Sequence, residues 1–126
     1  GLKRLLSTPD FRRRFEVQSG EFVKELEKDP TNAYAKLLKF YAGFPEIAEY
    51  KNPETGDTIL HDAVMNYLNA QPFGILEVVI LIHMGASLHT KNNEGISAKD
   101  FALQGGNTII KELVALEKPT IDDVYT

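Results

Sequence analysis

His61 and Asp62 are the residues of this 126-residue chain that most resemble a catalytic pair, because an imidazole beside a carboxylate can transfer a proton. They lie in the stretch GDTILHDA, residues 56–63. On a helix, side chains of adjacent residues diverge by about 100°, whereas a Ser-His-Asp relay needs side chains that converge. We therefore predict a structural role for His61.

The other residues that could perform chemistry do not form a known site. His83 and His89 do not have the spacing of metal ligands with His61. The chain has no cysteine, which excludes disulfides, thiolate metal sites and thiol nucleophiles. The stretches GGN and GASLHTKNNEG contain glycine but do not follow the strand-loop-helix order of phosphate-binding loops. We predict no metal, no cofactor, no small-molecule substrate and no enzymatic activity.

A basic patch near the N-terminus is the second candidate site. It comprises Lys3, Arg4, Arg12, Arg13 and Arg14, with Asp10 as the single acid of the first 14 residues, in a chain whose net charge is −4. Phenylalanines flank the arginines in FRRRF, so this patch could bind an anionic lipid surface or an RNA backbone. The alternative is the solvated side of a capping helix whose phenylalanines turn inward. The negative net charge disfavours nucleic acid as the partner.

The elements that would position these residues are predicted to be helices. Hydrophobic periodicity indicates about seven of them and no convincing strand, which is an all-α pattern. The first begins at STPDF, and Gly20 either splits or weakens it. A second helix follows Asp29-Pro30 and stops near Gly43, and a loop with one short helical turn after Pro45 comes next. Four more helices are expected to begin near Thr58, Ile75, Ser97 and Thr108.

Two stretches of the chain repeat each other. When ETGDTILHDAV is placed over NEGISAKDFAL, Gly56 aligns with Gly95 and Thr58 aligns with Ser97, at an offset of 39 residues. Glycine permits the positive φ of a tight turn, and threonine or serine caps a helix start. Each copy is followed by a breaker and then by a more apolar helix, so the repeated unit is a helical pair.

This unit resembles the ankyrin repeat, whose period is roughly 33 residues and whose signature is Gly-x-Thr-Pro-Leu-His-x-Ala. The residues that match the signature are Gly56, Thr58, Leu60, His61 and Ala63, and Ile59 stands in place of the proline. GASLHTKNNEG is similar to the projecting finger loop of the family. The second copy resembles a degenerate repeat, and a weaker third unit ends at Gly43. The resemblance covers about residues 54–117, and in the family the histidine steadies the turn near the threonine.

The resemblance implies an ankyrin-type solenoid of stacked helical pairs, because one pair cannot hide its apolar face alone. Leu60, Ala63 and Ala102 would allow close stacking. The seam between units would contain Ile80, Leu81, Ile82, Ile109, Ile110 and Leu113. Residues 1–50 would form an N-terminal helical cap with a possible degenerate repeat, residues 51–118 two repeats, and residues 119–126 a polar tail.

The resemblance also implies a module that binds another protein through the concave face made by the fingers and the first helices. Carried over by position, that face contains Tyr50, Lys51, Asn52, Asp57, Met65, Asn66, Lys91, Asn93, Ile96 and Gln104. One alternative is a regulatory or substrate-recruiting domain of a larger enzyme, which the start at Gly1 without methionine allows. A secreted bacterial effector is a special case of it. The other alternative is a lipid or nucleic-acid binder that uses the basic patch.

The location of the protein is predicted from what the sequence lacks. No apolar run is long enough to span a bilayer, and the N-terminus does not have the apolar core and cleavage site of a signal peptide. We therefore expect a cytoplasmic protein, or one in the host-cell cytoplasm if it is an effector.

Overall fold

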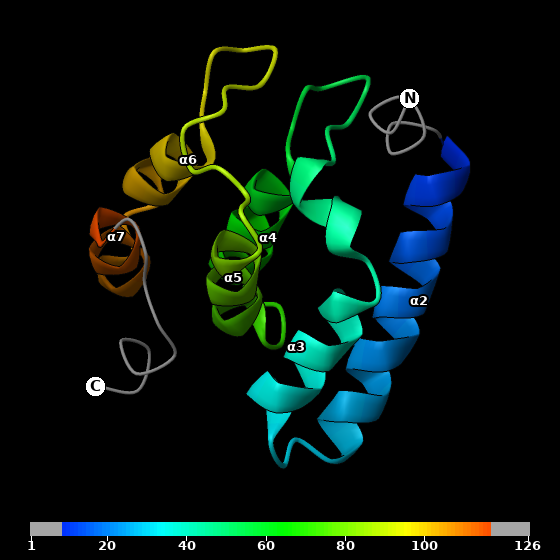
Figure 1. The fold of residues 1–126 in the computed structure, drawn as a ribbon. Helices are drawn as coiled ribbons and strands as arrows, with labels where there is room; N and C mark the ends of the chain where they lie inside the picture. Colours follow the sequence, from blue (N-terminus) through cyan, green and yellow to red (C-terminus); the bar gives the residue numbers. More distant parts are fainter. Residues whose placement is uncertain (1–8, 117–126) are drawn as a thin grey trace.

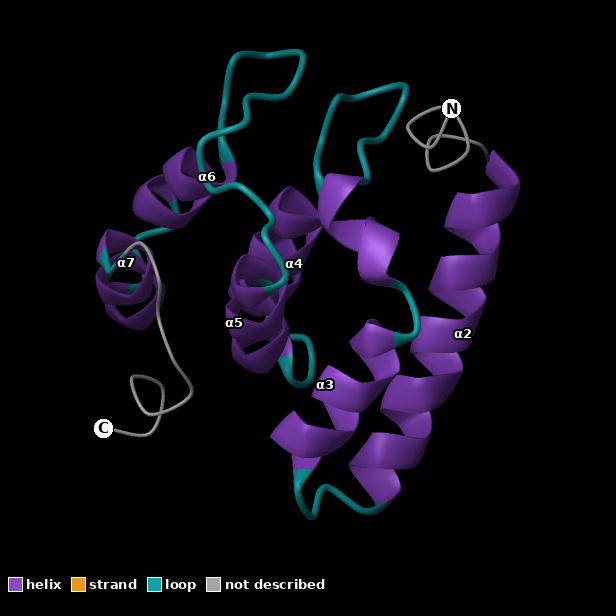
Figure 2. Cartoon of the chain, viewed as in Figure 1, coloured by secondary structure: helices purple, strands orange, loops and turns teal. Residues whose placement is uncertain are grey.

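The computed structural model describes residues 9–116, with side chains from residue 13 onward. Within this range the chain forms six α-helices, one 3-10 helix and no strand (Figures 1 and 2), which confirms the all-α prediction. The elements are α2 (Pro9–Lys28), α3 (Ala33–Ala42), η1 (Pro45–Glu49), α4 (Ile59–Leu68), α5 (Gly74–His83), α6 (Ala98–Gln104) and α7 (Thr108–Ala115). None of these helices combines the length and apolar character needed to cross a bilayer.

The repeated stretches form equivalent helix starts. At the start of α4, the Thr58 side chain accepts a hydrogen bond from the His61 backbone N–H, and the His61 side chain accepts one from the Thr58 backbone N–H. Ser97 and Asp100 make the same reciprocal capping box at the start of α6. These bonds satisfy backbone donors that a helix start leaves unpaired. The hydrogen bonds that the Asp100 carboxylate accepts from Ser97 hold its pKa below the ordinary value.

Of the two alternatives for Gly20, the structure excludes the split, because α2 continues through this residue. The second helix stops at Gly43, as predicted, with φ −76°. Asn32 precedes α3 with φ 56° and makes no side-chain cap. The short turn predicted after Pro45 is present as η1.

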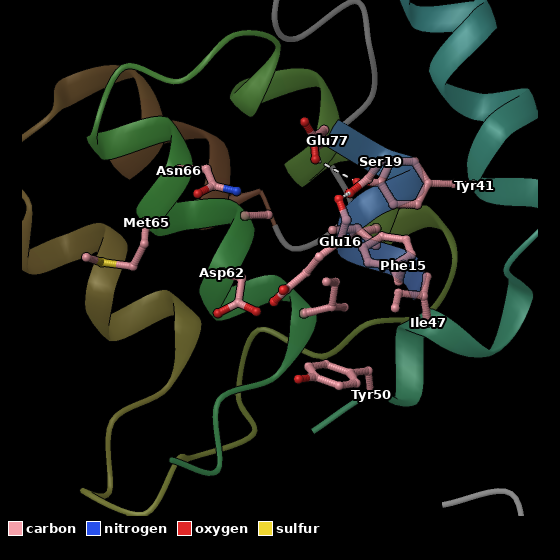
Figure 3. Close-up of a pocket in the computed structure, with 13 residues that line it drawn as sticks. Phe15, Glu16, Ser19, Tyr41, Ile47, Tyr50, Asp62, Met65, Asn66 and Glu77 are labelled. Atoms are coloured by element: carbon pink, nitrogen blue, oxygen red, sulfur yellow. Dashed lines mark hydrogen bonds between the residues drawn. The ribbon is translucent and has the colours of Figure 1, made fainter. Parts of the chain in front are cut away.

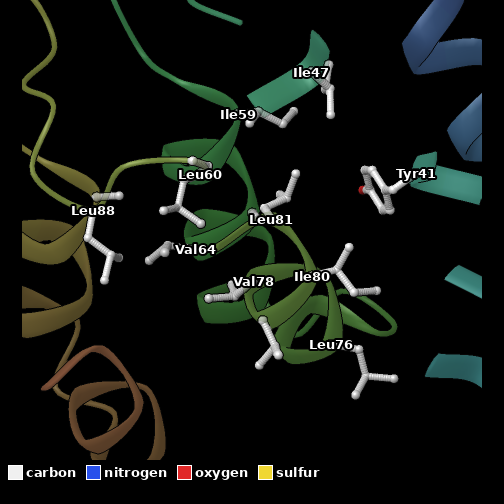
Figure 4. Packing of buried hydrophobic residues seen from close by; sticks show 14 of the residues in the cluster. Tyr41, Ile47, Ile59, Leu60, Val64, Leu76, Val78, Ile80, Leu81 and Leu88 are labelled. Carbon is white, nitrogen blue, oxygen red and sulfur yellow. The ribbon is translucent and has the colours of Figure 1, made fainter. Parts of the chain in front are cut away.

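The core is one continuous apolar cluster around α4 and α5, as Figure 4 shows. α4 packs against α5, α6 and η1, and α3 packs against α5. Leu60 and Ile80 are fully buried, and so is Ile110 of α7. Burial of each such side chain stabilises the fold by roughly 1.5–3 kcal/mol. The predicted burial is therefore confirmed for Leu60 and for four of the residues assigned to the seam, Ile80, Leu81, Ile110 and Leu113.

The other two residues predicted for the seam are less buried. Ile109 is 58% exposed, so its assignment to the seam was wrong. Ile109 and Ile110 are neighbours on α7, and because side chains of adjacent helical residues point in directions about 100° apart, Ile110 faces the core while Ile109 faces outward. Ile82 is only partly buried and packs at the edge of the cluster.

Aromatic rings join α2 to α3 at the N-terminal end of the described chain. Phe22 stacks on Phe40 with 4.6 Å between ring centroids, and Phe15 meets Phe44 edge to face at 5.5 Å. Phe15 and Leu26 are buried, in agreement with the predicted inner face of this helix.

Candidate functional site

Two loops project from the same end of the helices, one between η1 and α4 and one between α5 and α6 (Figure 1). We call them the first finger, residues 50–58, and the second finger, residues 86–97. Each is closed by an isolated antiparallel bridge, Lys51 with Thr58 and Lys91 with Ser97. The turns use glycine at φ 76° (Gly56) and φ 77° (Gly95), as predicted.

Hydrogen bonds tie the fingers to each other. The Asn93 backbone N–H donates to the Thr55 carbonyl at 3.0 Å, and the Asn93 side chain donates to the Glu54 carbonyl at 2.9 Å. The Asn92 side chain donates to Asp57 Oδ1 at 2.9 Å. A Cβ at Gly56 would lie 2.8 Å from the Asn93 backbone nitrogen, so only glycine lets the loops approach this closely. The pair therefore presents a pre-ordered surface.

His61 connects the two fingers and is fully buried. Its Nδ1 accepts a hydrogen bond from the Thr58 backbone N–H at 3.0 Å. The proton is therefore on Nε2, which lies 2.8 Å from the Ile96 carbonyl and donates to it. Both ring nitrogens thus make hydrogen bonds to backbone groups of the fingers, and this geometry agrees with the structural role predicted for His61.

Six of the ten residues predicted for the partner-binding face have exposed side chains. Met65 and Asn66 are exposed on α4, Gln104 at the end of α6, and Lys51, Lys91 and Asn93 on the fingers. Asp57 is half-buried, and its carboxylate is engaged by Asn92.

The other three predicted residues are not exposed. Tyr50 and Asn52 are buried, at 4% and 9% exposure. The Asn52 side chain folds back to accept hydrogen bonds from the Glu54 and Thr55 backbone N–H groups, a turn that the amide group favours. Ile96 is half-buried beside His61. These residues shape the fingers from inside rather than offering a surface.

Of the basic patch, only Arg13 and Arg14 have described side chains, and both are exposed on α2. Lys3, Arg4, the side chain of Arg12 and the predicted tail 119–126 lie outside the described part. Among residues 9–116, no group of histidine and acidic side chains is placed to hold a metal ion.

A cavity of about 300 Å³ lies between α2 and α4 (Figure 3). We call it the α2–α4 cavity. Residues of α2, α3, η1, α4 and α5 line it. η1 packs against α4 here. Met65 and Asn66 form part of the lining, so the cavity adjoins the exposed surface of α4.

The lining combines carboxylates with aromatic rings. The carboxylates are those of Glu16, Asp62 and Glu77, the rings are those of Phe15, Tyr41 and Tyr50, and no lysine, arginine or histidine is among the described residues that line the cavity. The Tyr41 hydroxyl donates a hydrogen bond of 2.6 Å to Glu77 Oε2, the dashed line in Figure 3. This bond links α3 to α5.

Burial raises the pKa values of both Tyr41 and Glu77. Desolvation raises the pKa of Glu77, and the hydrogen bond from Tyr41 partly opposes that rise. Burial also raises the pKa of Tyr41 well above 10.0, and the neighbouring Glu77 charge adds to the effect. A carboxylate in such a site gains from a nearby cation.

The sequence prediction did not find this cavity, because its lining comes from five elements spread over residues 15–81. One signal was present in the sequence. Glu77 interrupts the apolar stretch GILEVVILI, and an acid on the buried side of an otherwise apolar helix indicates a polar partner or a site.

Comparison with protein-family models, with curated proteins and with solved structures finds no match to this chain.

Proposed function

We propose that this chain is a short ankyrin-type array that binds another protein through its two fingers and the exposed sides of α4 and α6. The observation that carries the proposal is the hydrogen-bonded pair of fingers, in which His61 and Asn93 bridge two units of the same design. The matching capping boxes and the 39-residue offset support a repeated unit.

The proposed mechanism is recognition by a surface that is ordered before the partner arrives. The bonds between the fingers restrict their motion, so little conformational entropy remains to be lost on binding. The exposed side chains are mixed in type: Lys51 and Lys91 supply charge, and Met65, which is 41% exposed, supplies apolar contact. Methionine adapts to varied partner surfaces.

The experiment compares two double charge reversals. Lys51→Glu with Lys91→Glu alters the fingers, whereas the control, Lys39→Glu with Lys111→Glu, makes the same charge change on α3 and α7. All four side chains are exposed in the native chain, so both variants should keep the native circular dichroism spectrum. Proteins captured by the native chain are identified by mass spectrometry and their affinities measured.

We expect the finger variant to bind a captured partner at least tenfold more weakly, about 1.4 kcal/mol, while the control binds normally. Crosslinks from the partner should then map to the fingers. A partner that binds the finger variant and the native chain equally well would contradict the proposal.

A further inference from the structure

We infer that the end of the molecule opposite α2 is a docking surface for a helical-pair unit supplied by a partner protein. Figure 1 shows the second finger and α6 at this end. We call residues 93–95 of the second finger and Leu103 of α6 the end face. The inference rests on the repeated unit that the proposed function assumes, but it names a different surface and the kind of partner that fits it.

The contact between the two fingers shows how one finger is covered by the next. Asn93 donates a hydrogen bond from its backbone to the Thr55 carbonyl at 3.0 Å, and one from its side chain to the Glu54 carbonyl at 2.9 Å. Its backbone nitrogen lies so near Gly56 that a Cβ there would be 2.8 Å away. The second finger thus covers two carbonyls and one glycine of the first.

The equivalent groups of the second finger are uncovered in the described part of the chain. At the offset of 39 residues, Asn93 and Glu94 stand at the positions of the two carbonyls, and Gly95 stands at the position of Gly56. No hydrogen bond within residues 9–116 ends on the carbonyl of Asn93 or Glu94. Gly95 has φ 77°, close to the 76° of Gly56, and no atom lies within 4 Å of a Cβ added there. The second finger therefore repeats the surface that the first finger offers to its neighbour.

The helices show the same difference between the two units. Val64 of α4 is fully buried and points toward Leu88 of the second finger in Figure 4, and α4 packs against α6. Leu103 stands at the equivalent position of α6 and is 45% exposed. α6 itself carries Ala98 and Ala102, both fully buried. A partner helix with such small residues, beside a finger with an amide side chain, would cover Leu103 and remove its apolar surface from water.

A second copy of this chain does not offer such a unit. The second unit uses its own N-terminal side to cover the first. In the first unit that side is already occupied, because η1 packs against α4, and residues of α2 and η1 line the same cavity as Ile59 and Ala63. The C-caps of α5 and α7, Met84 and Leu116, are 32 residues apart, more than the ten residues that follow Leu116 in this sequence. The unit therefore belongs to another protein.

The first test covers the end face with a unit of known design. A second copy of residues 85–116 is inserted between Leu116 and Glu117 of the otherwise full chain, which gives an extended chain. Since Met84 and Leu116 are the C-caps of α5 and α7, the inserted finger leaves α7 as the second finger leaves α5. We expect the urea midpoint of the extended chain to be higher than that of the native chain, because neighbouring units stabilise each other.

Substitutions then show whether the inserted unit covers the end face. Leu103→Glu should lower the urea midpoint at least about twofold more in the extended chain than in the native chain, because the charge is then buried without a partner. Gly95→Ala should also cost more in the extended chain, where its Cβ meets the inserted asparagine. Leu38→Glu on α3, at a position that is 42% exposed, is the matched control and should shift both midpoints equally. No rise of the midpoint in the extended chain, or equal effects of Leu103→Glu in the two chains, would overturn the inference.

The second test concerns the partner and uses the native full chain, so it does not depend on the folding of the extended chain. Proteins captured by the native chain are compared for binding to the Leu103→Glu and Leu38→Glu chains. We expect a partner whose affinity falls at least about tenfold with Leu103→Glu and is unchanged by Leu38→Glu. The extended chain should not bind this partner, because the inserted unit occupies the end face. Partners that all bind the Leu103→Glu chain normally would contradict the inference.

Sedimentation of the native chain tests the other occupant of the end face. We expect a monomer, and a dimer that Leu103→Glu dissociates would assign the end face to a second copy and overturn the assignment to a partner. The result is separate from that of the proposed function. If only the inference is wrong, Leu103→Glu leaves partner affinity unchanged while Lys51→Glu with Lys91→Glu reduces it. If only the proposed finger surface is wrong, Leu103→Glu reduces partner affinity and the finger variant does not.

Discussion

At the scale of single residues, the two fingers depend on the hydrogen bonds of His61 and on the close contact at Gly56. His61 satisfies the Thr58 N–H and the Ile96 carbonyl with one buried ring. Gly56 and Gly95 have nearly the same φ, 76° and 77°, but their surroundings differ. Asn93 lies against Gly56, whereas no atom lies within 4 Å of a Cβ added at Gly95. A side chain at Gly95 would therefore meet backbone strain alone, whereas a side chain at Gly56 would meet the same strain and also clash with Asn93.

We expect Gly95→Ala to lower the free energy of unfolding by about 1–2 kcal/mol, the cost of the left-handed conformation for a residue with a Cβ. Gly56→Ala carries the same cost and also forces apart the two fingers, so it should be more destabilising by at least about 1 kcal/mol. Urea unfolding followed by circular dichroism measures both. Equal losses would mean that the fingers do not touch at Gly56.

At the scale of elements, neighbouring residues of one helix can differ completely in burial. Ile110 is fully buried, while Ile109 is 58% exposed. The sequence shows both as isoleucines in one apolar stretch, TIIKELVA. The position of α7 against α6 decides which of them is inside.

Ile110→Ala should therefore lower the free energy of unfolding by roughly 2–5 kcal/mol, because it leaves a cavity in the core. Leu60→Ala, at a fully buried position of α4, should have a similar cost. Ile109→Ala is the matched control and should change stability by no more than about 0.5 kcal/mol. A melting temperature that Ile110→Ala leaves unchanged would contradict the packing of α7 described here.

At the scale of the whole molecule, the buried cluster runs without a break from Phe15 in α2 to Val114 in α7. Small domains with one core usually unfold in a single transition. Four of the five tyrosines lie between residues 34 and 67, so tyrosine fluorescence reports mainly on the N-terminal half, whereas circular dichroism reports on all helices.

The fluorescence and circular dichroism transitions of the native chain should therefore coincide. Leu37→Ala in α3 and Val114→Ala in α7, both at buried positions, should each move the whole transition to a lower urea concentration. Two separated transitions, or a C-terminal variant that leaves the fluorescence transition in place, would show that the ends of the molecule unfold independently.

The sequence by itself determined the features that depend on nearby residues. The helix starts at Thr58 and Ser97, the turns at Gly56 and Gly95, the short helix after Pro45 and the structural role of His61 were all predicted. Each of these depends largely on hydrogen bonds or backbone angles within about four residues, so the local pattern contains the information; the exception is the bond from His61 to the Ile96 carbonyl, which the tertiary structure brings together.

Tertiary structure alone decided the burial of Tyr50 and Asn52, the exposure of Ile109 and the existence of the α2–α4 cavity. The cavity lies between α2 and α4, where aromatic rings join α2 to Phe40 and Phe44 and η1 packs against α4. Contacts between residues so far apart in the chain arise from the packing of whole elements. Hydrophobic periodicity shows which face of a helix is apolar, but it does not show which element packs against that face or how closely.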